Sequence, residues 1–168
     1  MTNEIMKVTQ DENGLEYIEI DNDLAEAKIA LQGGHVVWWR PKSTAHDVLW
    51  LSTNARYEKG RSIRGGVPIC WPWFGQHPTD GSFCNHGFAR VIPWKLEDCV
   101  KLKNGAVKII LKMLPTEAAT KQLTYDYDLE LTIIVGHTLC ILPTATVVGG
   151  GSGARRPKRV TECALLHR

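Results

Sequence analysis

The chain of 168 residues is 43% apolar and 23% charged, values that exclude a largely disordered protein and suit one globular domain. Its net charge of +2 is uneven: residues 149–168 contain five basic side chains and one acidic one, whereas residues 1–148 contain 15 basic and 17 acidic ones. This balance argues against nucleic-acid binding by the body of the chain.

The first clear pattern is an alternation of apolar and charged side chains over residues 25–31 (AEAKIAL). A period of two over this length predicts a half-buried β-strand. Gly33 and Gly34 then predict a turn into a second strand. That strand carries the adjacent Trp38 and Trp39, which should point to opposite faces of the sheet.

Two later segments, residues 107–113 and 125–135, alternate in the same way, and the second is the longest such run in the chain. Gly136-His137 predicts a tight hairpin turn into a further strand over residues 138–148. The one short helix that we expect covers residues 116–122. Several short antiparallel strands with Gly/Pro turns predict an all-β sandwich or barrel.

Residues 62–94 hold two arginines, two histidines, three tryptophans and the densest Gly/Pro punctuation of the chain. Such a segment predicts a rigid loop suited to a small polar or anionic ligand. Arg64 and Arg90 could clamp a phosphate or carboxylate between them. The alternative is that each arginine pairs with a local acid such as Asp80.

The histidines and aromatic residues also allow two interpretations. His86 could contact a ligand or shuttle a proton, or it could be a structural turn residue. We expect His77 to be exposed and His35 to be a hydrogen-bonded residue at a strand edge. Three aromatic residues of the same segment could form a sugar-stacking platform or part of the loop core. They are Trp71, Trp73 and Phe74.

Five widely spaced cysteines without a C-x-x-C pair predict reduced thiols in the cytoplasm rather than a disulfide framework. No histidine pair has the H-x-x-x-H spacing of helical metal sites, and no nucleotide-binding glycine motif occurs, so we expect no metal and no cofactor. No apolar run approaches the roughly 18 residues of a membrane-spanning helix. The N-terminus shows no secretory signal, so we expect no membrane partner.

Residues 149–168 differ from the rest of the chain. GGGSGARRPKR has no periodicity and predicts a flexible linker whose basic residues 155–159 form an unstructured tail. The apolar TECALLHR follows. Because a sandwich strand should not end in this way, we expect a truncated or altered form of a longer protein.

Two motifs occur in order: IRGGVPICWPWFG over residues 63–75 and NHGFARVIPW over residues 85–94. They resemble the hexose-6-phosphate mutarotases, also called glucose-6-phosphate 1-epimerases, which are relatives of aldose 1-epimerase. The resemblance extends over most of residues 15–148, including ALQGGHVVWWRP and VLWLS. It implies an incomplete antiparallel β-sandwich of the galactose-mutarotase type over residues 1–148, followed by a separate tail over residues 149–168.

The resemblance also implies interconversion of the α and β anomers of a sugar 6-phosphate. In that family a carboxylate takes the proton of the anomeric hydroxyl while a histidine protonates the ring oxygen. The family's phosphate-binding arginines fall on Arg64 and Arg90, and a ligand-contacting residue, often Gln in relatives, falls on Asn85. The histidine of the HGFAR motif falls on His86, a further substrate contact.

The family's catalytic histidine lies in an A-L-H-T-Y-F segment, whose nearest counterpart here is ALLHR with His167. The family's catalytic glutamate lies further along, in a region with no counterpart in this sequence. Two hypotheses therefore stay open: a sugar-phosphate epimerase, and a non-catalytic sugar-phosphate-binding module. We also expect self-association through exposed sheet edges unless the tail covers them.

Overall fold

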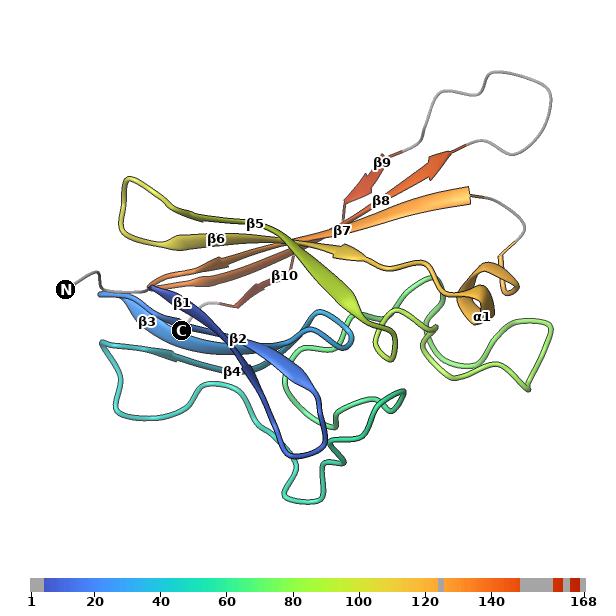
Figure 1. Ribbon diagram of the computed structural model, residues 1–168, viewed down its shortest axis with the longest axis horizontal. Coiled ribbons are helices and arrows are strands. Elements are labelled where there is room, and N and C mark those ends of the chain that lie inside the picture. Colours follow the sequence, from blue (N-terminus) through green and yellow to red (C-terminus); the bar gives the residue numbers. More distant parts are fainter. Residues whose placement is uncertain (1–4, 124–125, 149–158, 162–163, 167–168) are drawn as a thin grey trace.

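The computed structural model describes residues 5–123, 126–148, 159–161 and 164–166, which form two antiparallel sheets stacked face to face (Figure 1). The first sheet has the strand order β1-β2-β3-β4. Its strands are β1 (Met6–Gln10), β2 (Glu16–Asp21), β3 (Ala25–Ala30) and β4 (His35–Pro41). This architecture confirms the expected all-β sandwich.

The second sheet has the order β10-β8-β7-β6-β5, with β9 also paired to β8. Its strands are β5 (Trp94–Lys101), β6 (Val107–Met113), β7 (Asp126–Val135), β8 (Leu139–Val148), β9 (Arg159–Thr161) and β10 (Ala164–Leu166). A single turn of helix, α1 (Glu117–Thr120), lies between β6 and β7. Thr116 caps this helix, because its side chain accepts a hydrogen bond from the amide of Ala119. The helix is shorter than the one expected over residues 116–122.

The alternating segments form the predicted strands. In β6 and in β7 from Leu129 onward, each fully buried residue is followed by a half-buried one. The predicted hairpin joins β7 to β8, and the amide of Gly136 donates to the carbonyl oxygen of Thr138 over 3.1 Å. The strand expected over residues 25–31 ends one residue early, at Ala30.

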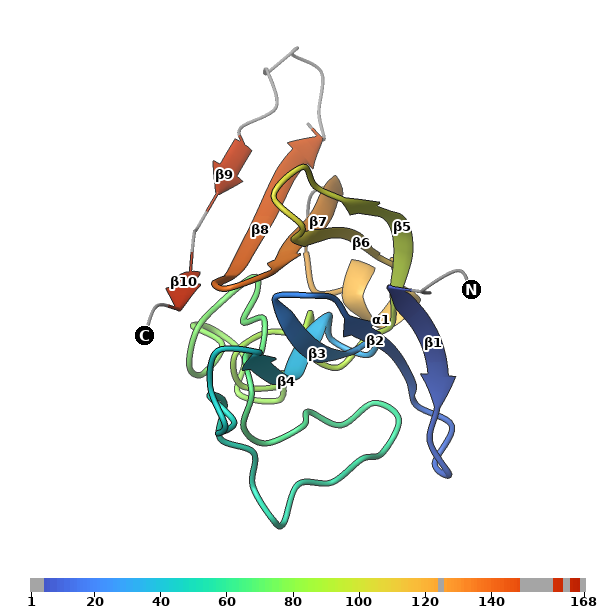
Figure 2. The ribbon, with the colours of Figure 1, turned by 90° about the vertical axis from the view of Figure 1, so that its left-hand side faces the viewer.

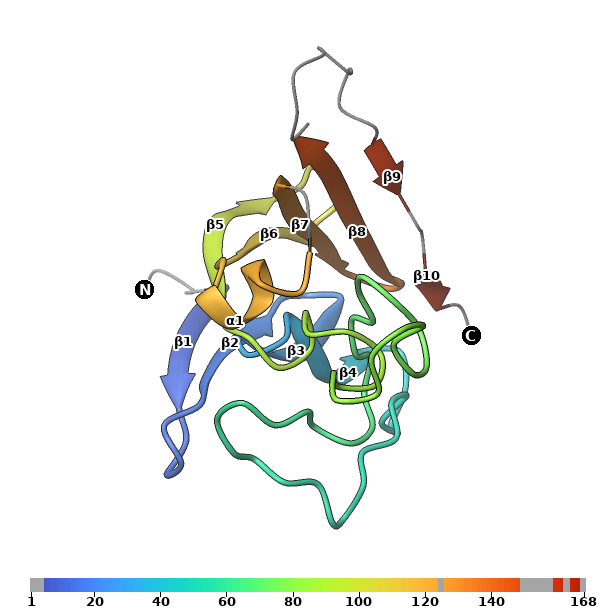
Figure 3. The ribbon, with the colours of Figure 1, turned by 90° about the vertical axis from the view of Figure 1, so that its right-hand side faces the viewer.

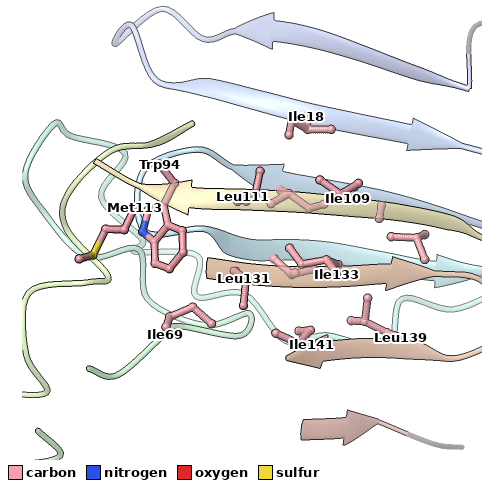
Figure 4. Close-up of a cluster of buried hydrophobic side chains, with 14 of the residues drawn as sticks. Ile18, Ile69, Trp94, Ile109, Leu111, Met113, Leu131, Ile133, Leu139 and Ile141 are labelled. Atoms are coloured by element: carbon pink, nitrogen blue, oxygen red, sulfur yellow. The ribbon is translucent and has the colours of Figure 1, made fainter. Parts of the chain in front are cut away.

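The main core lies between the two sheets (Figure 4). Its fully buried members on the second sheet include Ile109, Leu111, Leu131, Ile133, Leu139 and Ile141. Asn22, in the turn between β2 and β3, adds a polar link between the sheets. Its Nδ2 donates to the carbonyl oxygen of Val135 over 3.1 Å, while its Oδ1 accepts from the amide of Ala25.

A second, smaller core covers the other face of the first sheet. A β-bulge in β4 creates part of it, because Ile29 is opposite Val36 and Lys28 is opposite Trp38, which leaves Val37 as the extra residue. Trp39 is buried in the main core and Trp38 packs against the smaller one, which confirms their opposite orientation. The smaller core consists of Leu15, Tyr17, Ala30, Val37 and Ile63.

The tail differs in part from its sequence pattern. Arg159, the last basic residue of the segment expected to be unstructured, begins β9, while residues 155–158 lie outside the described part of the chain. Figures 2 and 3 show β9 and β10 beside β8 at the edge of the second sheet. Among the described residues, no helix has the length and apolar character needed to cross a membrane.

Candidate functional site

The long connection between β4 and β5, residues 42–93, carries most of the predicted site. In Figure 1 its green part gathers at one end of the sandwich, near α1. Four isolated bridges attach it to the first half of the chain or to itself: Gln32 with Pro93, Val36 with Val67, Leu51 with Gly65, and Trp71 with Gly87. The connection is therefore an ordered loop without regular strands, as its Gly/Pro content predicts.

Residues 64–66, here called the arginine turn, present Arg64 to solvent. The turn is held by its backbone: the amide of Ser52 donates to the carbonyl oxygen of Arg64 over 3.0 Å, and the amide of Gly66 donates to that of Trp50 over 2.8 Å. Gly66 has a φ of +62°. A side chain there would overlap the carbonyl oxygen of Val36, so this close approach requires glycine.

Neither arginine pairs with an acid among the described residues. The alternative that assigned Asp80 to them is wrong for this structure. That carboxylate instead accepts hydrogen bonds from the amide and hydroxyl of Ser82, over 2.9 and 2.6 Å. An exposed guanidinium without a carboxylate partner is available to an anionic ligand.

Arg90 lies deeper than Arg64 and is half-buried. Its Nη2 donates to the backbone carbonyl of Asn85 over 2.7 Å, while its Nε is buried and has no hydrogen-bond partner in the described part of the chain. The structure thus brings Arg90 and Asn85 together through the backbone. Asn85 itself is exposed to solvent.

His86 occupies a left-handed backbone conformation with a φ of 65°. Its amide donates to the carbonyl oxygen of Gly75 over 2.7 Å, and the amide of Gly75 donates back to His86 Nδ1 over 3.1 Å. A ring nitrogen that accepts a hydrogen bond carries no proton, so in the neutral ring Nε2 is the donor. His86 therefore supports the turn through Nδ1, and its Nε2 has no hydrogen-bond partner among the described residues.

His35 is hydrogen-bonded at a strand edge, as expected, but only through one of its two ring nitrogens. It begins the edge strand β4 and its Nε2 bonds the carbonyl oxygen of Gly65 over 2.7 Å, but its Nδ1 has no partner among the described residues. Burial, aided by the nearby charge of Arg90, lowers the pKa of His35 to about 4, against the opposing effect of the bond to Gly65. The sequence did not predict that His35 contacts the arginine turn, because residues 35 and 65 become neighbours only in the fold.

Two of the three aromatic residues, Trp71 and Trp73, pack within the loop. Trp71 packs edge-on against Phe88, with ring centroids 5.5 Å apart, and Trp73 contacts the same ring at 6.0 Å, so both belong to the loop core. Phe74 is 81% exposed and touches the ring of His86. His77 is half-buried rather than exposed, because it packs against Trp73 and accepts hydrogen bonds from two backbone amides.

The remaining predicted residues add little to the site. Cys70, Cys84 and Cys99 are free thiols. Among the described residues, no group of three His, Cys, Asp or Glu side chains is placed to hold a metal ion. His167 lies outside the described residues. The candidate site therefore comprises the arginine turn, the loop of residues 85–90 and His35, which contacts the turn.

The sequence of residues 16–141 matches the family model for aldose 1-epimerase. One curated relative, from Salmonella typhimurium, is 40% identical over 124 residues and is named "Putative glucose-6-phosphate 1-epimerase". The alignment covers 74% of this chain and 41% of that protein. The chain therefore spans about two fifths of the length of this curated relative.

Solved structures show the same likeness. A crystal structure described as a putative mutarotase (YeaD) from Salmonella typhimurium superposes with a TM-score of 0.78 at 35% identity, over 86% of this chain and 48% of that one. A galactose mutarotase-like protein from Lactobacillus casei has a TM-score of 0.57 at 22% identity, over 78% of this chain and 44% of that one. The second comparison shows the fold alone, which is of the galactose-mutarotase type.

Proposed function

The chain belongs to the aldose 1-epimerase family, and from this premise we propose that it binds a hexose 6-phosphate and interconverts its α and β anomers. The observation that carries the proposal is the pair of arginines on one ordered loop, neither of them in an ion pair with a described acid. A phosphate is the part of such a substrate that guanidinium groups recognise best. The name of the Salmonella typhimurium relative points to the same substrate class.

In the proposed reaction a base takes the proton of the anomeric hydroxyl, the bond between C1 and the ring oxygen breaks, and the ring oxygen gains a proton. The open-chain aldehyde rotates about its C1–C2 bond and recloses through the reverse proton transfers. Arg64 and Arg90 would hold the phosphate and so fix the sugar against rotation of the whole molecule. Nε2 of His86 would donate a hydrogen bond to a sugar oxygen.

A second candidate is a non-catalytic sugar-phosphate-binding module. It is favoured by one observation: no carboxylate of the described residues forms a hydrogen bond with His86 or with either arginine. Loss of a positioned acid or base commonly lowers a rate by about 10²–10⁴-fold. Both candidates share the phosphate contact and differ only in turnover.

Exchange spectroscopy by NMR, on the two anomers of glucose 6-phosphate at equilibrium, tests the proposal. We expect the chain to accelerate exchange above the buffer rate, and Arg64→Ala to reduce this acceleration. Binding measured by calorimetry without acceleration would establish the module instead. Equal affinity for glucose and glucose 6-phosphate would contradict the phosphate contact in both candidates.

A further inference from the structure

We propose that His35 is a positioning residue that holds the arginine turn where Arg64 and Arg90 can act on one ligand. This inference rests on the proposed function and deepens it, because it assigns a role to a residue outside the connection of residues 42–93. His35 is not expected to touch the ligand. It acts through the backbone of the turn.

The contact that supports this role is short, and the imidazole that makes it is buried. His35 is 0% exposed, and its Nε2 lies 2.7 Å from the carbonyl oxygen of Gly65, the central residue of the arginine turn. A carbonyl oxygen can only accept, so Nε2 must carry the hydrogen. In a buried position such a bond is costly to break, because a carbonyl left without a donor loses its interaction with water as well.

The neighbouring backbone closes the turn from the other side. The amide of Val67 donates to the carbonyl oxygen of Val36 over 2.9 Å, so β4 contacts the chain directly after the turn. A Cβ placed on Gly66 would lie 2.8 Å from Nε2 of His35. Position 66 therefore has no room for a side chain beside the ring, and a side chain without a donor at position 35 would leave the carbonyl of Gly65 without this bond.

The charge state of the ring suits this position. Arg90 is close enough for its guanidinium to help keep His35 neutral, and its own buried Nε has no partner among the described residues. A lysine or arginine at position 35 could also donate to Gly65, but it would add a third positive charge beneath the two arginines. A neutral imidazole supplies the hydrogen without that repulsion.

His35→Leu and His35→Gln test the proposal as a pair. Leucine fills space without a donor, whereas the amide nitrogen of glutamine can replace Nε2. Ile109→Val is the control for general destabilisation, because it weakens a fully buried core position on β6 and leaves position 35 unchanged. Two quantities are measured for each variant: calorimetric affinity for glucose 6-phosphate, and hydrogen exchange of the Gly66 and Val67 amides relative to the amides of β2 and β3.

We expect His35→Leu to speed exchange of the two loop amides and to weaken sugar-phosphate binding about 3- to 10-fold, the effect of one lost hydrogen bond. His35→Gln should restore most of the slow amide exchange and most of the affinity. Ile109→Val should change neither the exchange of the loop amides nor the affinity. Unchanged relative exchange in His35→Leu would overturn the proposal, as would faster exchange with unchanged affinity. If the unmodified chain binds no sugar phosphate, the proposed function fails, and the claim that His35 holds the turn is decided by the exchange rates alone.

Discussion

Nη2 of Arg90 donates a hydrogen bond of 2.7 Å to the backbone carbonyl oxygen of Asn85, five residues earlier in the chain. The bond closes the loop that presents His86, so the guanidinium has a structural task. A guanidinium has five N–H donors, and this bond uses one of them. Arg90 can therefore hold the loop and contact a phosphate at the same time, whereas Arg64 has no comparable side-chain bond among the described residues.

The two arginines should consequently respond differently to substitution. Arg64→Ala should weaken glucose 6-phosphate binding by about 1.5–3 kcal/mol, the usual range for a charge-assisted bond, with little change in melting temperature. Arg90→Ala should weaken binding by a similar amount and also lower the melting temperature, because the carbonyl of Asn85 loses its donor. Calorimetric titration and thermal denaturation measure the two effects.

Neutral glucose is the control for this pair, since it offers no phosphate to the guanidinium groups. Its affinity should be nearly unchanged in Arg64→Ala. Equal losses for glucose and glucose 6-phosphate would mean that Arg64 shapes the loop rather than binding the phosphate.

Stability should depend on pH through His35. Its pKa of about 4 in the folded chain lies below the ordinary value of 6.5, so between these values the unfolded chain binds a proton that the folded chain does not. The free energy of unfolding should therefore fall as the pH drops from about 6.5 to about 4, by about 3 kcal/mol in total from this group. Urea denaturation at several pH values measures this slope.

His35→Gln has no titrating ring and should flatten the slope in that interval. The ring faces the carbonyl of Gly65 and the guanidinium of Arg90, and both groups are retained in this variant. An identical slope in the variant would assign the pH dependence to other residues.

Gly87 and Gly75 form a matched pair for testing how tightly the loop is packed. Both have positive φ values, 71° and 77°, so alanine strains the backbone at either position. A Cβ on Gly87 would overlap the carbonyl oxygen of Trp71, whereas one on Gly75 meets nothing within 4 Å. Gly75→Ala should cost about 1–2 kcal/mol of stability, the penalty of the left-handed conformation alone.

Gly87→Ala should cost clearly more than Gly75→Ala and should also change tryptophan fluorescence, because Trp71 has to move. Chemical denaturation followed by fluorescence gives both quantities. Similar costs for the two variants would show that the contact between Gly87 and Trp71 is easily relaxed.

The sequence predicted the strands better than the site. Residues 107–113 and 129–135 alternate with period two because one face of each strand packs in the core, and burial follows that alternation. The bulge at Val37 was not predictable, since it depends on how β4 pairs with β3. The role of His35 was missed for a similar reason: its partner Gly65 is 30 residues away, and no local pattern records that contact.

The last prediction concerns the edge of β8 that β9 and β10 cover. β9 pairs with Thr144, Ala145 and Thr146, while β10 pairs with Leu139, Cys140 and Ile141. An uncovered strand of ten residues presents unpaired N–H and C=O groups that favour edge-to-edge association. Removing residues 149–168 should therefore shift the chain from its original size toward dimers or larger species in size-exclusion chromatography with light scattering. Adding Thr146→Lys to the shortened chain should reverse much of this shift, because a charge on an edge strand opposes pairing. A shortened chain of unchanged size would mean that β9 and β10 do not protect this edge.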